Sequence, residues 1–433
     1  MPPLDEVLGL IRAYPDLPPE AVFKEDILRR GLAFSPEARQ RAAAGKRKSY
    51  FIFSFDLQDL PEEAEGAAAS TPEEVRLAGG AFRFRPTVVS VRNHPRSPYR
   101  IETGAEDDIR LTLDGEPVCG VEFPPVPEYY RRSLSSGKPV IDICPTIEWG
   151  YLLYLAVYRL CQYSSPETEC RFCDINHNFR RRQKSGQSYT GIKSVEEVLE
   201  ALEIIASTDT VGRAYTVTGG SIYGTLHGET EAEFYGKYPL AIESRFPGRW
   251  TGKLVAQALP REELQRLKDG GLSIYHPNYE VWDARLFEML CPGKSRYLGR
   301  DLWMKRILEA AEVFGPSRVI PNFVAGVEMS APYGFSSVEE ALRSTGEGLE
   351  FYMSRGICPR FTTWCPEPMS QLGRTQGGAP LAYHVGLLRL WRETHRRHRL
   401  MVPPGYGPPG AGHAVFSVSA FMDVLPESPE NQG

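Results

Sequence analysis

The sequence lacks a strong net charge of either sign. Its 433 residues include 50 Lys and Arg against 55 Asp and Glu, which gives a formal net charge of −5. Proteins that bind nucleic acid through its phosphates present a strongly basic surface, and this balance supplies no excess of basic residues for one. We therefore expect no nucleic-acid partner.

Long apolar runs are also missing. No segment approaches the roughly 18 uninterrupted apolar residues of a membrane span. The opening stretch MPPLDEVLGLIRAYPDLPPE carries acids and prolines where a signal peptide has a basic start and an apolar run. We therefore expect a cytoplasmic protein with no membrane partner. Because thiols stay reduced there, clustered cysteines are more often metal ligands or catalytic groups than disulfides.

The pattern along the chain divides it into three regions. Residues 1–145 are rich in proline and contain β-branched strand candidates, with a hairpin signal at Asp114-Gly115. We expect an N-terminal α+β region of unknown role there. Residues 146–400 alternate strand candidates with helix candidates, and residues 401–433 are expected to form a C-terminal extension rich in Pro and Gly.

The middle region contains about six strand-then-helix units. The strand candidates are, in order, YLLYLAVYRLC, RAYTVTGG, GKLVAQALP, GLSIYHPN, RVIPNFVAG and CPRFTTWC. Capping boxes at Ser194-x-x-Glu197 and Ser337-x-x-Glu340 open two of the helices. This order predicts an α/β fold with a parallel sheet, built as an open partial barrel or as a doubly wound sheet. In both architectures the chemistry lies at the carboxyl ends of the strands.

Three of the eight cysteines lie in the stretch CQYSSPETECRFC, just after the first of these strands. Cys161, Cys170 and Cys173 allow three interpretations. A zinc ion would need a fourth ligand such as His177. Free cysteines also pack as small hydrophobes in a core. An iron–sulfur cluster would use three thiolates and leave one iron open for a substrate or cofactor.

The same stretch resembles the cluster loop of radical S-adenosylmethionine (SAM) enzymes. The family pattern is C-x-x-x-C-x-Φ-C with an aromatic Φ, and Cys170-Arg171-Phe172-Cys173 reproduces its second half. The first gap departs from the pattern, since eight residues separate Cys161 from Cys170. A longer loop still returns its ends to one cluster, because the entropy of loop closure grows only slowly with length. The resemblance implies a [4Fe-4S] cluster on these three cysteines.

Further motifs follow in the family's order. Thr218-Gly219-Gly220-Ser221 ends the second strand where the family carries G-G-E, with Ser221 in place of Glu. Glycines let the backbone approach a ligand closely, here the amino group of the methionine moiety. The resemblance to biotin synthase-like members makes Asn278 and Glu280, in YHPNYEVWD, candidates for the ribose hydroxyls.

The same resemblance extends to the next helix and strand. Arg300 is the candidate for the methionine carboxylate, since a guanidinium suits bidentate contact with such a group. Gly326 and Glu328 in NFVAGVE resemble the fifth-strand motif that supports adenine beside an apolar side chain, here Val324.

Taken together, these motifs resemble a radical SAM enzyme of the biotin synthase-like branch. The resemblance implies a partial (β/α)6, TIM-like barrel in which the cluster reductively cleaves SAM to a 5′-deoxyadenosyl radical. That radical would abstract hydrogen from a small-molecule substrate in a biosynthetic step. A reductant such as flavodoxin or ferredoxin would be a partner. The alternatives are transfer of a methyl or aminocarboxypropyl group from SAM, and a zinc-stabilised binding protein without catalysis.

Few residues indicate what acts on the substrate. Cys365, at the end of the sixth strand, is a candidate hydrogen-atom donor or nucleophile, although an inert buried thiol is the more common role. His276 is a candidate proton carrier. Cys291 and Cys358 have no partner at metal-binding spacing, so no second cluster is expected. The sequence indicates no oligomeric state.

Overall fold

The computed structural model describes residues 2–45, 71–104, 108–184, 191–409 and 416–426. It has a mixed α/β architecture with parallel strands, which confirms the predicted fold class at that level. One hydrophobic core runs through the described part of the chain, from Val7 to Leu425.

The described residues of the N-terminal region form helices that accompany a six-stranded sheet. The helices are α1 (Pro3–Ala13), α2 (Pro19–Arg30) and α3 (Pro36–Ala44). The strands are β1 (Ala33–Phe34), β2 (Glu74–Gly79), β3 (Phe84–Ser90), β4 (Tyr99–Thr103), β5 (Ile109–Leu113) and β6 (Glu116–Glu122), in the order β1-β4-β5-β6-β2-β3. Asp114 and Gly115 connect β5 to β6 with φ of 51° and 87°, the left-handed pair that a tight hairpin turn requires. The hairpin prediction is confirmed.

The second part of the chain contains the predicted parallel strands. They are β8 (Leu152–Tyr158), β9 (Ala214–Gly219), β10 (Thr251–Ala256), β11 (Ile274–Pro277), β12 (Asn322–Ala325) and β13 (Arg360–Thr363), preceded by β7 (Thr146–Ile147). The sheet order is β11-β10-β9-β8-β7, with β7 antiparallel to β8. Strands β12 and β13 pair in parallel as a separate two-stranded sheet. Bridges from Tyr275 to Val319 and from Glu280 to Phe323 connect the two sheets.

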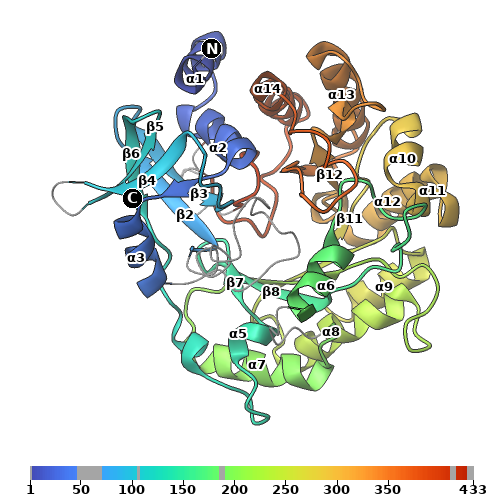
Figure 1. Cartoon of the computed structure of the whole chain (residues 1–433). Helices are drawn as coiled ribbons and strands as arrows, with labels where there is room; N and C mark the ends of the chain where they lie inside the picture. Colours follow the sequence, from blue (N-terminus) through green and yellow to red (C-terminus); the bar gives the residue numbers. More distant parts are fainter. Residues whose placement is uncertain (1, 46–70, 105–107, 185–190, 410–415, 427–433) are drawn as a thin grey trace.

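The helices of this part of the chain lie mostly around the outside of these strands, whereas α6 lies nearer the middle of the view (Figure 1). They are α5 (Val140–Ile143), α6 (Ile175–Lys184), α7 (Val195–Thr208), α8 (Glu231–Arg245), α9 (Arg261–Asp269), α10 (Ala284–Leu290), α11 (Pro292–Tyr297), α12 (Arg300–Phe314), α13 (Val338–Met353) and α14 (Leu381–Arg397). Short 3-10 turns occupy Glu128–Arg131, Pro316–Arg318 and Val327–Met329. The complete capping box at Ser194 and Glu197 opens α7, as predicted. At α13 the Ser337 side chain accepts the Glu340 N–H, which is half of the predicted box.

A C-terminal segment joins the two parts of the molecule. Ser90 of β3 donates its N–H to the Ser417 carbonyl at 2.9 Å, and Thr363 of β13 donates its N–H to the Val418 carbonyl at 3.0 Å. The segment therefore lies between the N-terminal sheet and the last parallel strand. On the other side, the Glu74 carboxylate of β2 accepts the N–H groups of Glu148 and Trp149, just before β8. The N-terminal sheet thus contacts both flanks of the parallel strands.

Helix α2 packs against β13 and α14 through buried charged groups. The Lys24 ammonium forms an ion pair with Asp423 at 2.9 Å. The Glu25 carboxylate accepts the Thr363 hydroxyl at 2.5 Å and the Ala420 N–H at 2.7 Å. Such groups are stable in a core only when they are paired. The three segments are therefore held in one fixed arrangement.

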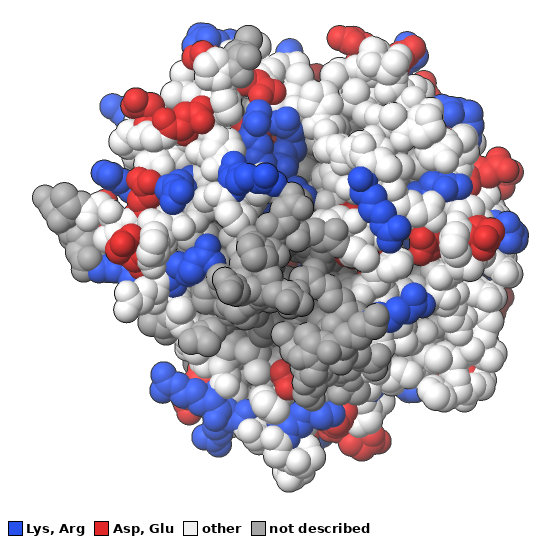
Figure 2. Space-filling model, viewed as in Figure 1, with Lys and Arg blue, Asp and Glu red and all other residues white. Residues whose placement is uncertain are grey.

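The exterior shows no single dominant charge on the face in view. Figure 2 shows Lys and Arg interspersed with Asp and Glu around this face. One cluster of basic side chains lies over α2. None of the described helices has the length and apolar character that crossing a membrane requires.

Replacing Glu25 by Gln is expected to stabilise the protein in a pH-dependent way. Burial raises the pKa of Glu25 from 4.5 to about 7. The folded state therefore holds its proton more tightly, and the wild type loses stability as pH rises from about 4.5 to 7. Gln does not titrate, so the variant should gain up to about 3 kcal/mol over the wild type across this window. Denaturant unfolding at pH 5 and pH 8 measures this, and a difference independent of pH would contradict it.

Candidate active site

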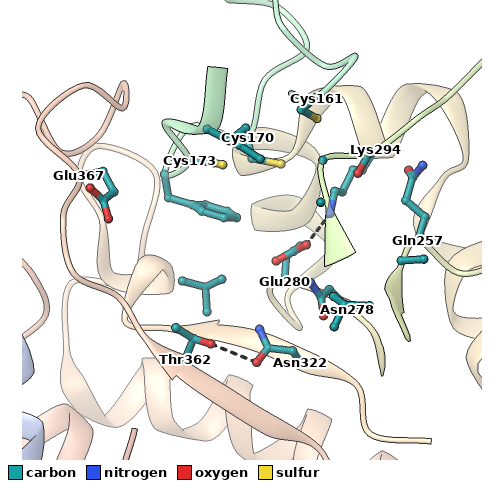
Figure 3. A pocket seen from close by; sticks show the side chains of 18 of the residues that line it. Cys161, Cys170, Cys173, Gln257, Asn278, Glu280, Lys294, Asn322, Thr362 and Glu367 are labelled. Atoms are coloured by element: carbon teal, nitrogen blue, oxygen red, sulfur yellow. Dashed lines mark hydrogen bonds and ion pairs between the residues drawn. The ribbon is translucent and has the colours of Figure 1, made fainter. Parts of the chain in front are cut away.

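The three cysteines of the predicted cluster motif line one cavity at the carboxyl ends of the parallel strands (Figure 3). The cavity has a volume of about 170 Å³. Of the predicted site residues, it is also lined by Phe172, Gly219, Gly220, Ser221, Asn278, Glu280, Val324 and Cys365. Residues from five widely separated segments therefore meet at the place where such folds carry their chemistry.

A clamp from α6 fixes the long cysteine loop. The Asn176 side chain accepts the Cys161 N–H at 2.9 Å and donates to the Cys161 carbonyl at 3.1 Å. The side chain is 5 % exposed, so water competes little for these bonds. The first cysteine is thereby held next to the helix that follows the third one, which closes the loop despite its eight-residue gap.

The second half of the loop is anchored to α10. The Arg171 guanidinium donates to the Met289 carbonyl at 2.6 Å, and the Arg171 N–H donates to the Leu290 carbonyl at 2.9 Å. A turn bond from the Cys173 N–H to the Cys170 carbonyl, at 3.0 Å, fixes the C-x-x-C pair. Both thiols consequently face the same side of the cavity as Cys161 (Figure 3).

The glycine pair at the end of β9 permits close packing against this loop. A Cβ at Gly220 would lie 1.8 Å from the Leu160 carbonyl oxygen and 2.7 Å from the Cys161 Cα. A Cβ at Gly219 would lie 2.2 Å from the Tyr158 carbonyl oxygen. Only residues without a side chain fit here. The glycines thus position the first cysteine, in addition to exposing backbone to the cavity.

Burial opposes ionisation at two of the three thiols, whereas neighbouring groups favour it at the third. Burial raises the pKa of Cys161 to about 12 and also raises that of Cys173. The pKa of Cys170 is lowered by a hydrogen bond with the Cys291 thiol, and the Lys294 charge acts in the same direction. A metal centre would replace these protons, because the thiolate is the form that binds metal.

A buried ion pair lies beside the thiols. The Lys294 ammonium contacts the Glu280 carboxylate, and both side chains are more than nine-tenths buried (Figure 3). Burial alone would lower the pKa of Lys294, but Glu280 and the nearby thiols raise it. Glu280 has a φ of 63°, a left-handed conformation that is strained for a residue other than glycine. Its carbonyl accepts the Val324 N–H at 2.9 Å, which holds this conformation.

The far wall of the cavity carries amide and hydroxyl groups. Thr362 donates its hydroxyl to Asn322 Oδ1 at 3.2 Å (Figure 3). Oδ1 of Asn278 is buried and has no hydrogen-bond partner among the described residues. A buried polar atom without a partner is costly unless a ligand or water pairs with it. Asn278 is therefore available to a bound molecule. The Cys365 thiol donates to the Leu28 carbonyl at 3.1 Å and is 5 % exposed.

The remaining predicted site residues do not line this cavity. The Arg300 guanidinium donates to the Trp282 carbonyl at 2.8 and 3.2 Å and lies over the Trp282 ring, so α12 holds it away from the cavity. Gly326, at φ 105°, packs against Ala379. Thr218 faces a second cavity below the first.

Two further candidates are buried structural groups. The Glu328 carboxylate accepts the Gly326 N–H and the Thr345 hydroxyl. His276 is fully buried, its Nδ1 contacts the Ile320 carbonyl, and burial depresses its pKa well below the usual value. Neither residue lines the first cavity, which holds the cysteines and is called the upper cavity below. A neutral buried imidazole is also a poor proton carrier at physiological pH.

Several lining residues were not predicted for the cofactor site. They are Glu231, Gln257, Lys294, Asn322, Thr362 and Glu367. Gln257 directly follows β10, so the rule that chemistry lies at the carboxyl ends of strands identifies it. Its side chain accepts the Tyr163 hydroxyl at 2.8 Å and ties the cysteine loop to that strand. Lys294 lies in a charge-rich loop of the sequence, and only the fold shows that it is buried.

The donor set fits a cluster better than a single ion. Among the described residues, no three His, Cys, Asp or Glu side chains approach closely enough to hold one metal ion. A tetrahedral zinc site gathers all its ligands around one point. A cubane places each thiolate on a separate iron, which suits three thiols spread around one cavity.

Comparison with known proteins gives partial structural likeness. No protein-family model matches the chain, and no curated protein does. HydG, a maturase of the [FeFe]-hydrogenase, has a TM-score of 0.41 and 16% identity over 56% of this chain and 49% of its own. Methylornithine synthase (PylB) has a TM-score of 0.41 and 14% identity, covering 56% and 63%. OxsB, a cobalamin-dependent S-adenosylmethionine radical enzyme, has a TM-score of 0.33 and 12% identity, covering 74% and 44%.

The chain thus spans less than two thirds of the length of each of these three structures. The case for a function rests on the residues of the cavity.

Replacing Gly220 by Ala is expected to lower the free energy of unfolding by about 1–3 kcal/mol. The new Cβ would overlap the backbone of the cysteine loop. Gly224→Ala is the matched control, since a Cβ there meets nothing within 4 Å. Denaturant unfolding of the metal-free proteins compares the two. Equal stability of both variants would show that the loop does not depend on the glycine.

Proposed function

We propose that this protein is a radical SAM enzyme, in which Cys161, Cys170 and Cys173 hold a [4Fe-4S] cluster and SAM occupies the adjoining cavity. The observation that carries the proposal is the convergence of three buried thiols and Phe172 on one cavity at the carboxyl ends of the strands. The strand series β8–β13 with its outer helices would be the partial (β/α)6 barrel. When bound, the cluster and SAM supply a 5′-deoxyadenosyl radical that abstracts hydrogen from a substrate.

The residues of the cavity have distinct tasks in this proposal. The unpaired Asn278 Oδ1 and the Glu280 carboxylate accept hydrogen bonds from hydroxyl groups of a bound nucleoside. Lys294 provides the positive charge on the cavity wall, beside Cys170, and suits a carboxylate. Val324 and Phe172 supply apolar surface, and the enclosed walls exclude water.

The residues around the cavity bear on the branch of the family in opposite ways. Asn278 and Glu280 follow the fourth parallel strand and line the cavity, as the biotin synthase-like pattern implies. Arg300 speaks against that branch, because its guanidinium is occupied by Trp282 outside the cavity. In this chain Lys294 takes the position of the cation at the cavity.

Iron content and SAM cleavage test the proposed cluster. Protein reconstituted without oxygen should bind about four irons per chain, and Cys170→Ala should lose this iron. Cys358→Ala is the control, because Cys358 is a buried cysteine that does not line the cavity.

With a chemical reductant, the wild type should form 5′-deoxyadenosine from SAM. One zinc per chain without iron would overturn the proposal. Formation of 5′-methylthioadenosine instead would indicate aminocarboxypropyl transfer and would also overturn it.

The affinity for SAM tests whether Asn278 in the cavity, and not Arg300 outside it, contacts the bound molecule. Asn278→Ala should weaken SAM binding by about 1 kcal/mol, roughly fivefold, because one hydrogen bond in the cavity is lost. Arg300→Met should leave the affinity unchanged, because Arg300 lies outside the cavity. Calorimetric titration of the reconstituted variants measures both values. A large loss in the Arg300 variant alone would place the ligand elsewhere.

A further inference from the structure

A second cavity of about 200 Å³, the lower chamber, lies beneath the first. The two share the lining residues Gly219, Val255, Asn278, Asn322 and Thr362, so they adjoin along one layer of side chains. The lower chamber is lined by alternate residues of the strands, such as Thr216 and Thr218 on β9 or Lys253 and Val255 on β10. Alternate residues of a strand face the same side of the sheet, and Thr216 and Lys253 lie one step further from the carboxyl ends than Thr218 and Val255.

The walls of the lower chamber carry opposite charges. Lys253 of β10 and Arg360 of β13 provide cations, and Glu148 before β8 and Glu73 before β2 provide carboxylates. Glu148 is 3% exposed, and its Oε2 has no hydrogen-bond partner among the described residues. The charges attract across the chamber, but no ion pair joins Glu148 to either cation in the described structure.

Both cations keep donors free. The Lys253 ammonium donates to the Gly405 carbonyl and lies 4.1 Å from the centroid of the Tyr406 ring. The Arg360 guanidinium donates one N–H to the Tyr406 hydroxyl at 2.7 Å, while its buried Nε has no partner among the described residues. A lysine has three donor hydrogens and an arginine five, so each has donors left for a ligand. Gly405 and Tyr406 thus orient the two cations and leave some of their donor hydrogens for a ligand.

The backbone fixes Glu148 in a strained conformation. Glu148 and Trp149 have φ of 54° and 57°, left-handed values that are uncommon for residues with side chains. The Glu74 carboxylate accepts both of their N–H groups, at 2.8 and 2.6 Å, and so stabilises this turn. Strain of this kind persists where surrounding contacts enforce it, and it is concentrated at functional sites. Here it presents the Glu148 carboxylate to the chamber.

We infer that the lower chamber binds a small zwitterion, an α-amino acid, whose carboxylate contacts Lys253 and Arg360 and whose ammonium group contacts Glu148. In naming this ligand as the substrate, the inference rests on the proposed function, since the chamber adjoins the cavity assigned to SAM. The ligand's carboxylate supplies the negative charge that pairs with the two cations, and its ammonium group supplies the positive charge that pairs with Glu148. Burial raises the pKa of Glu148 to about 7 and lowers that of Lys253 to about 8, so both charges are costly until a ligand pairs with them.

Binding measurements on the reconstituted holoenzyme with SAM test this inference. The probes are the twenty protein L-amino acids, each measured by calorimetry and by the shift in Tm. At least one should bind and raise Tm. Its N-acetyl derivative lacks the ammonium group and its carboxamide lacks the carboxylate, so each should bind at least tenfold more weakly. Absence of binding by every amino acid, or equal binding of the neutral derivatives, would overturn the inference.

Protein variants test the same contacts from the other side. Glu148→Gln should reduce affinity for the amino acid about tenfold or more. Glu25→Gln is the matched control, because Glu25 is an equally buried carboxylate whose pKa is also raised to about 7, but it lines neither cavity. Equal affinity of the two variants would overturn the role of Glu148. Deuterium from the bound amino acid should appear in 5′-deoxyadenosine, and its absence would overturn the assignment as substrate.

The two proposals fail in different ways. If iron is bound and 5′-deoxyadenosine forms but no amino acid binds, only the inference about the lower chamber is wrong. If iron is absent, the proposed function is wrong, and amino-acid binding to the same protein still decides whether the lower chamber recognises a zwitterion.

Discussion

The candidate site depends on closing the loop between Cys161 and Cys170. Eight intervening residues leave that loop free to place its two ends far apart. Asn176 prevents this by holding both backbone polar groups of Cys161, and Gly220 allows the loop to pack directly on the end of β9. Every role assigned to the upper cavity requires the three thiols to face the same side of that cavity. All of these roles therefore depend on the contacts that Asn176 and Gly220 make with the cysteine loop.

A second constraint comes from buried charge at the junction of the N-terminal region, β13 and the C-terminal segment. Lys24, Glu25 and Asp423 are each less than one-tenth exposed, and each is satisfied by partners from another segment. Displacing one segment would leave a buried charge without a partner, which is strongly unfavourable. The junction therefore favours a single arrangement. That arrangement also fixes the segment from which Phe416, Ser417 and Val418 face the lower chamber.

Much of the architecture can be predicted from local sequence patterns. The apolar strand candidates that alternate with helix candidates located all six parallel strands, and the caps at Ser194 and Ser337 located the starts of two helices. These signals depend on residues close in sequence, so they survive without knowledge of the tertiary fold. The C-x-x-C spacing likewise indicates that Cys170 and Cys173 share a site, whereas Cys161 was assigned to it by the resemblance to the family's cluster loop.

Positions set by tertiary contacts were harder to predict. Arg300 stands at the right distance along the sequence, but the Trp282 carbonyl and ring engage its guanidinium, and no local pattern reveals this competition. Lys294 lies in a charge-rich stretch of the sequence that carries no motif, yet the fold buries it against Glu280. The pairing of Asn176 with Cys161 joins residues fifteen positions apart through side-chain geometry alone. Which cation reaches a cavity is decided by packing, and sequence spacing gives only the candidates.

The two adjoining cavities differ in the charged groups that they present to a ligand. The upper one gathers sulfur, aromatic and apolar groups around one internally paired Lys-Glu couple, so a ligand there meets few uncompensated charges. The lower chamber keeps its opposite charges apart, because Lys253 and Arg360 are tethered to Tyr406 and Gly405 while Glu148 is held by Glu74 through the backbone. Charges that cannot relax toward each other retain their attraction for a ligand. The contacts of Lys253 and Arg360 with Gly405 and Tyr406 therefore keep the lower chamber polarised.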